Sequence, residues 1–182
     1  MAGIIILSVL GFLIVLLVIW VIATYNRFIS LKNNIDEAFS TMDVYLKKRY
    51  DLIPNLVSTV KGYAKHEKET LERVISARNM AMNSQNMEEK VANENALSGT
   101  LKSLFAISES YPELKADKNF MDLQESLKNI ESEIASSRKY YNGVVKTYNT
   151  LREKFPSNII SSFFKFEKRS LFEIENKGER QN

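Results

Sequence analysis

An uninterrupted apolar run near the amino terminus constrains this chain more than any other feature. Residues 4–23 are Ile, Leu, Val, Phe, Trp and Ala, broken by one Ser and one Gly. Twenty helical residues extend roughly 30 Å, the thickness of the hydrocarbon core of a bilayer. The first charged side chain is Arg27, so no charge would enter the lipid. We therefore predict a transmembrane anchor over residues 1–24 and a soluble domain over residues 25–182.

A cleaved signal peptide is the competing interpretation of this run. Signal peptides place a basic stretch before a shorter apolar core and end in a small-residue cleavage site. Here no Lys or Arg precedes the run, whereas Trp20, Tyr25 and Arg27 follow it as interfacial anchors. We expect an uncleaved, single-pass anchor. Because Arg27 and Lys32 flank only its carboxyl end, the positive-inside rule favours an outside amino terminus and a cytoplasmic domain.

Composition removes most kinds of site chemistry. The 182 residues include no Cys, one His, six Gly and three Pro. Without Cys there is no disulfide, thiolate zinc site, iron–sulfur cluster or cysteine nucleophile. Few Gly and Pro argue against β-sandwiches, β-barrels and Gly-rich phosphate loops. The net charge of +3 is too small to indicate a nucleic-acid partner, and a long-helix, all-α protein remains.

Apolar residues recur at alternating spacings of three and four through the rest of the chain, as in helices that bury one face. No Pro or Gly separates the stripe beginning at Phe28 from the apolar run, so one helix is expected to cross from anchor to domain. The first possible break is Pro54, where the helix either kinks or restarts with Asp51 as its N-cap. The stripe from Leu123 to Phe155 has coiled-coil spacing. We predict an antiparallel bundle of three to four long helices.

Several polar residues fall on or beside these stripes. Ser108 and Ser137 occupy stripe positions, while Asn142 and Asn149 each follow a stripe tyrosine. Buried polar groups in coiled coils commonly fix register or partner number. The alternative is that these groups border the stripe and bind backbone or water.

A motif in the first soluble stretch resembles the LemA family of bacterial membrane proteins. The residues that carry the resemblance are Arg49, Tyr50, Asp51, Leu52, Ile53, Pro54, Asn55 and Leu56, followed by Gly62, His66 and Glu67. The pairs Ala77-Arg78, Tyr148-Asn149 and Phe155-Pro156 fit the same family, although Phe39 stands where Trp is frequent. The resemblance implies a helical bundle anchored in the bacterial cell membrane, and it implies no enzyme. Some members of the family carry a lipoprotein cysteine, which would place the domain outside the cytoplasm.

The segment around His66 is the strongest candidate for enzymatic chemistry. On a helix, His66 and Glu69 would share a face and could bind one metal ion. A zincin needs a second His at position 70, where Thr stands, and a di-metal site needs a second Glu-x-x-His. We therefore expect a solvated helix face here, with no catalytic site, metal, cofactor or small-molecule substrate.

Two basic segments have structural and functional interpretations. The run Lys47-Lys48-Arg49 lies about 35 Å beyond the anchor on a continuous helix, too far for lipid headgroups to attract it. We expect pairing with acidic residues of the bundle or of a neighbouring subunit, or else plain solvation. The segment 159–169 interleaves aromatic and basic residues and is either a cap on the bundle or an interfacial or partner-binding patch. Its candidate residues are Phe163, Phe164, Lys165, Phe166, Lys168 and Arg169.

Two functional classes fit these features. The first is a non-enzymatic scaffold, held in the bilayer by residues 4–23, that forms homo-oligomers and organises the membrane or an assembly on it. The alternative is a single-pass adaptor or signalling accessory whose bundle binds a protein partner. The mass of the purified protein separates the two.

Overall fold

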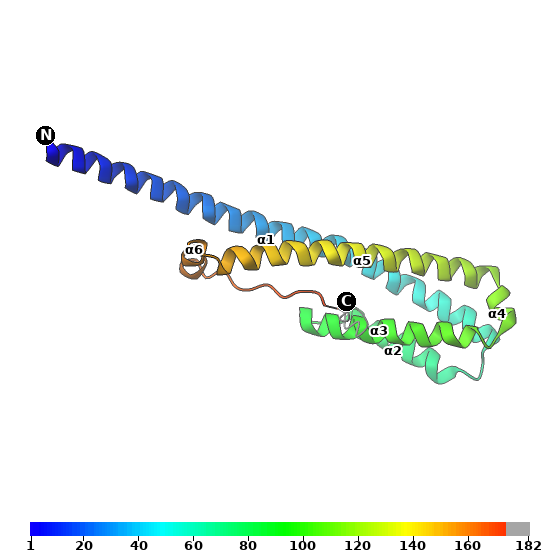
Figure 1. Cartoon of the computed structure of the whole chain (residues 1–182). Helices are drawn as coiled ribbons and strands as arrows, with labels where there is room; N and C mark the ends of the chain where they lie inside the picture. The colour runs from blue at the N-terminus through cyan, green and yellow to red at the C-terminus, as the bar shows by residue number, and fades with distance from the viewer. Residues whose placement is uncertain (174–182) are drawn as a thin grey trace, which may run out of the picture.

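The computed structural model describes residues 1–173, which form six helices joined by short connections (Figure 1). They are α1 (Ala2–Tyr63), α2 (Lys68–Met82), α3 (Met87–Ser108), α4 (Pro112–Ala116), α5 (Lys118–Glu153) and α6 (Ser157–Phe163). The prediction of an all-α protein is confirmed over these residues.

Helix α1 carries both the apolar run and part of the helical domain. It is 62 residues long, which confirms the continuous helix expected from the sequence. Its first part extends alone beyond the other helices (Figure 1), and residues 4–19 are exposed there. This part is long and apolar enough to cross a membrane, with a mean hydropathy of 3.3. Trp20 and Val21 are already half-buried against the core, so packing begins before the apolar run ends.

The helix neither ends nor restarts at Pro54, and Asp51 lies within it rather than at an N-cap. Proline has no N–H to donate to the carbonyl four residues earlier, which belongs to Tyr50. Arg78 of α2 takes the place of that donor, because its Nε lies 2.7 Å from the Tyr50 oxygen. The vacant backbone acceptor has thus become an interhelical contact, and α1 ends one residue after Gly62.

Helices α1 and α5 run in opposite directions along each other (Figure 1). The rings of Phe28 and Tyr148 lie 5.8 Å apart, and those of Phe39 and Tyr141 lie 6.0 Å apart, so one residue number rises as the other falls. Helix α2 packs on α3 and on α1. Buried residues of all these helices form one core; the largest apolar ones include Phe28, Met42, Leu46, Ile53, Leu56, Leu97, Leu104, Phe120 and Tyr148.

Side-chain caps fix where two of the helices begin. The Asn86 side chain accepts a hydrogen bond from the Glu89 N–H at 2.9 Å and so caps the start of α3. The Glu89 carboxylate reaches back to the N–H of Gln85 at 2.8 Å. Asp117 caps α5 in the same way by accepting from the Phe120 N–H at 2.8 Å.

Two serines of α6 hold the corner that follows α5. Ser157 Oγ donates to the carbonyls of Leu151 and Lys154 at 2.6 and 2.8 Å, and Ser161 Oγ donates to Arg152 O at 2.9 Å. Carbonyls at the end of a helix have no intrahelical partner, so these bonds satisfy them. As a result α6 turns back beside α1, at the end of the domain from which the apolar run emerges (Figure 1).

Candidate functional site

The Arg49 side chain, from the motif that resembles the LemA family, is buried at the centre of an ion cluster. It is only 1% exposed. Its Nη2 pairs with Glu94 of α3, and its Nη1 lies 2.6 Å from Glu131 Oε1 of α5 and 3.3 Å from Ser98 Oγ. The expected pairing of the basic run with acidic residues of the same domain is confirmed for this residue. One guanidinium therefore joins three helices.

Tyr50 completes the cluster by donating its hydroxyl hydrogen bond to the Glu94 carboxylate. Burial raises the pKa of Tyr50 to about 12, despite the opposing effect of the Arg49 charge. Removing a carboxylate and a guanidinium from water costs several kcal/mol each, and close pairing offsets that cost. Breaking the pair would leave a charge unpaired in the core. The geometry therefore suits fixing the positions of α1, α3 and α5 rather than catalysis.

Asp43 forms a second polar link between α1 and α3. It lies 2.8 Å from Lys47 Nζ and 3.0 Å from Lys90 Nζ. Burial alone would raise the pKa of Asp43, but the hydrogen bonds from Lys47 and Lys90 leave it below its ordinary value. The remaining member of the basic run, Lys48, lies 5.3 Å from the centre of the Tyr45 ring.

The other motif residues are spread over the surface and the core. Ile53 and Leu56 are buried, while His66 lies exposed in the loop between α1 and α2. The helix face expected to join His66 with Glu69 is therefore not formed, which corrects the sequence-based geometry. Within residues 1–173 no group of three or more His, Cys, Asp or Glu is placed to hold a metal ion. Exposed or half-buried motif residues are Asp51, Leu52, Pro54, Asn55, Gly62 and Glu67.

Asparagine side chains of α5 bind the main chain of residues 166–172, which have no regular secondary structure. Asn149 donates to Arg169 O at 2.8 Å and accepts from Arg169 N at 3.0 Å. Asn142, seven residues earlier, makes the same pair of bonds to Phe172 at 3.0 and 2.8 Å. The two Tyr-Asn pairs noted in the sequence therefore bind backbone, which was one of the two alternatives considered.

Neighbouring residues of α5 extend this contact. Tyr148 Oη and Tyr141 Oη donate to the carbonyls of Glu167 and Ser170, each at 3.0 Å. Arg152 Nε donates to the Phe166 carbonyl at 2.9 Å. Because these bonds go to backbone atoms, they fix the main chain of the segment in addition to the packing of its side chains.

The aromatic residues near the carboxyl terminus divide into two groups. Phe166 stacks on Phe28 with ring centres 4.5 Å apart, and Phe172 is fully buried, so both cover the core. Phe163 and Phe164 are 78% and 42% exposed. Among the basic residues of this region, Lys165 is exposed, Lys168 lies 3.3 Å from Glu153 and Arg169 is held by Asn149.

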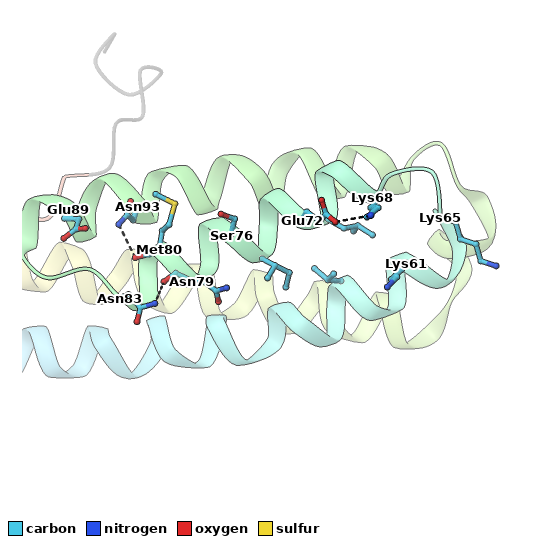
Figure 2. Close-up of a pocket in the computed structure, with 13 residues that line it drawn as sticks. Lys61, Lys65, Lys68, Glu72, Ser76, Asn79, Met80, Asn83, Glu89 and Asn93 are labelled. Atoms are coloured by element: carbon cyan, nitrogen blue, oxygen red, sulfur yellow. Dashed lines mark hydrogen bonds and ion pairs between the residues drawn. The ribbon is translucent and has the colours of Figure 1, made fainter.

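Among several grooves on the surface of the described residues, one borders α2 and one borders α5, and both are lined in part by α1. The larger lies between α1 and α2, has a volume of about 920 Å³, and has apolar walls from Val57, Leu71 and Ile75. Figure 2 shows Lys61, Lys65 and Lys68 near its loop end and Asn79, Asn83 and Asn93 toward its other end. A groove of about 550 Å³ lies between α1 and α5; its lining includes Leu31, Tyr140, Gly143 and Val144.

Comparison with known proteins identifies the family. A family model described as LemA family matches residues 38–182. The chain belongs to the LemA family. Protein LemA of Metamycoplasma hominis is 24% identical over 140 residues, which cover 75% of this chain and 63% of that relative. Magnetosome protein MamQ 2 of Paramagnetospirillum magneticum is 24% identical over 200 residues, covering 96% of this chain and 72% of the relative, and MamQ 1 of the same organism matches equally.

The LemA match includes the Arg49 cluster, both Asn–backbone pairs and the larger groove. The family is not known as one of enzymes. The partners of Arg49, namely Glu94 and Glu131, did not emerge from the sequence. A signal for one of them exists: Glu94 precedes Leu101 by seven residues and so occupies a stripe position where an apolar residue is expected.

Proposed function

We propose that this LemA-family chain is a non-enzymatic scaffold, anchored in the bacterial cell membrane, that self-associates and organises the membrane or an assembly on it. Its body is an antiparallel bundle of three to four long helices on the cytoplasmic side. The supporting observation is the continuity of α1, whose 62 residues include both the apolar run and Arg49, the centre of the ion cluster. Because a helix is stiff, a lateral contact between anchors orients the bundles too.

The groove between α1 and α5 is where we place the contact between copies. Tyr140 is 61% exposed at its edge, and a side chain at Gly143 would meet only open space. Leu31, also in the groove, lies eight residues beyond Ala23, about 12 Å along a helix. Copies anchored in one membrane present this groove at one height, so closed rings or dimers can form about an axis normal to the bilayer.

Light scattering of the full chain in detergent tests this proposal. We expect one discrete multimer, which Tyr140→Asp converts to monomer because a charge enters the contact. Met121→Asp, an equally simple change at a 47% exposed position of α5, should leave the mass unchanged. A monomeric parent protein, or equal effects of the two substitutions, contradicts the proposal.

The alternative is an adaptor, and the groove between α1 and α2 favours it. Apolar walls with three lysines at one end suit an amphipathic partner helix that carries acidic residues. A photocrosslinking amino acid at Ile75 should then form an adduct of one defined mass in cells, while Ile75→Asp leaves the oligomer unaltered. An adduct only with this same chain, or none, excludes the adaptor.

A further inference from the structure

Helix α6 lies where the apolar run of α1 meets the domain. Tyr25 is two residues beyond Ala23, an axial rise of about 3 Å. The Tyr25 ring lies 4.8 Å from the ring of Phe164 and 5.7 Å from that of Phe166. Figure 1 shows α6 beside this part of α1. If α1 crosses a bilayer, α6 is therefore level with the surface from which α1 emerges.

The residues in and around α6 are divided into a buried and an exposed side. Ser157, Ile160 and Ser161 are buried toward the domain. Ile159 and Phe163, one helical turn apart and so on one face, are 57% and 78% exposed. Phe155 and Phe164, at the two ends, are 74% and 42% exposed. Four large apolar side chains within ten residues therefore face outward, and in water such a cluster is unfavourable.

We propose that α6 is an interfacial helix whose exposed apolar face, formed by Phe155, Ile159, Phe163 and Phe164, inserts at the headgroup–acyl boundary of the leaflet from which α1 emerges. This inference does not rest on self-association. The chain then contacts the membrane twice, through a spanning helix and through a helix lying on the surface. A second contact beside the spanning helix restricts the tilt of α1.

Exposed cations next to this face agree with a lipid surface. Two of them, Lys154 and Lys165, are exposed and adjoin Phe155 and Phe164 in sequence. Arg27 is also exposed and lies two residues after Tyr25, whose ring contacts Phe164. Basic residues that flank an apolar interfacial face bind lipid phosphates while their aliphatic stems stay near the apolar region. Phe166 is not part of the inserting face, because it stacks on Phe28.

The chain has no Cys, so single cysteines report on single positions. Phe163→Cys and Ile159→Cys, each carrying an environment-sensitive fluorophore, are compared with Tyr140→Cys in the full chain. The control position is also exposed, but it lies far from the predicted membrane surface. It adjoins Tyr141, whose ring packs on Phe39, and Phe39 is about 24 Å along α1 from the end of the apolar run. Each protein is placed, one copy per nanodisc, in phosphatidylcholine with phosphatidylglycerol and lipids spin-labelled near the headgroup.

We expect spin-labelled lipid to quench the fluorophores at 163 and 159 at least threefold more than the one at 140. Equal quenching at the three positions overturns the proposal. So does weak quenching at 163 and 159 together with a blue shift of their emission that arises only when several copies share a disc, because another copy then covers α6. Since each disc holds one copy, the outcome is independent of whether the chain forms multimers.

Discussion

Pro54 and Arg78 affect stability together, so the contribution of either residue depends on the other. A proline inside a helix normally costs about 3 kcal/mol. Here the carbonyl that it leaves free accepts a charged hydrogen bond from Arg78. We expect Arg78→Ala to lower the free energy of unfolding by about 1–3 kcal/mol, because Tyr50 O then loses its donor. In a Pro54→Ala background, which restores the backbone N–H, the same change should cost less than half as much.

Urea unfolding of the four proteins, followed by circular dichroism, measures this coupling. Arg73→Ala, on the same helix and directed to Thr70 at 3.1 Å, is the matched control and should be insensitive to the residue at 54. Equal costs of Arg78→Ala in both backgrounds would mean that Arg78 does not substitute for the missing N–H.

The buried Arg49–Glu94 pair leads to a second prediction about side chains. Arg49→Met leaves the Glu94 carboxylate unpaired in the core and should destabilise the protein by about 3–5 kcal/mol. Replacing both, as Arg49→Met with Glu94→Leu, removes the two charges together and should recover at least half of the loss. Thermal unfolding of the full chain in detergent provides the comparison. A double variant as unstable as the single one would show that the pair is not the source of the cost.

Hydrogen bonds from several residues of α5 hold residues 166–172 against this helix. Asn149→Ala removes two hydrogen bonds to Arg169, and Asn142→Ala removes two to Phe172. We expect each to speed hydrogen–deuterium exchange of the segment by about 10- to 100-fold, corresponding to about 1–3 kcal/mol. Thr147→Ala, on the exposed side of α5, serves as the control and should leave exchange unchanged. Slow exchange in both asparagine variants would mean that apolar contacts alone hold the segment.

Buried tyrosines make the packing of the helices sensitive to alkali. Burial raises the pKa of Tyr50, Tyr141 and Tyr148 above their ordinary value of 10.0, in Tyr50 to about 12. The unfolded chain therefore loses these protons first, so the stabilisation is complete below about pH 10 and declines as the pH rises toward 12. We expect the urea midpoint of unfolding, measured from pH 8 to 12, to decrease as the pH rises from about 10 toward 12. The decrease should be smaller in Tyr50→Phe. An equal decrease of the midpoint in the parent protein and in Tyr50→Phe would mean that other groups cause the loss of stability.

Local sequence was enough to predict an all-α protein with a continuous first helix, but not the loop at His66 or the polar contacts between helices. Phe28 and the residues at helical spacing after it predicted the helical part of α1 beyond the apolar run, because this signal lies within neighbouring residues. Arg49 meets partners 45 and 82 positions away, and no local pattern encodes such pairs. Of the two alternatives at Pro54, the restart at Asp51 does not occur, and the donor that substitutes there comes from another helix.

Across the whole molecule, the apolar run and the helical domain share one packing unit at their junction. Trp20 and Val21 pack on the core, and Tyr25 packs on Phe164 and Phe166. A fragment that begins at Arg27 loses these contacts, whereas one that begins at Ile19 keeps them without the rest of the run. The longer fragment should be more stable by about 1–3 kcal/mol, the value of burying one or two large side chains.

Urea unfolding of the two fragments in the same mild detergent measures this difference, with hydrogen exchange of residues 157–166 as a local readout. Tyr25→Ala in the longer fragment is the matched control and should remove much of the difference, because it removes the ring between α1 and α6. Equal stability of the two fragments would mean that the contacts at the junction do not stabilise the domain. A stable junction instead means that a tilt of the anchor turns α6, and with it the whole length of α5.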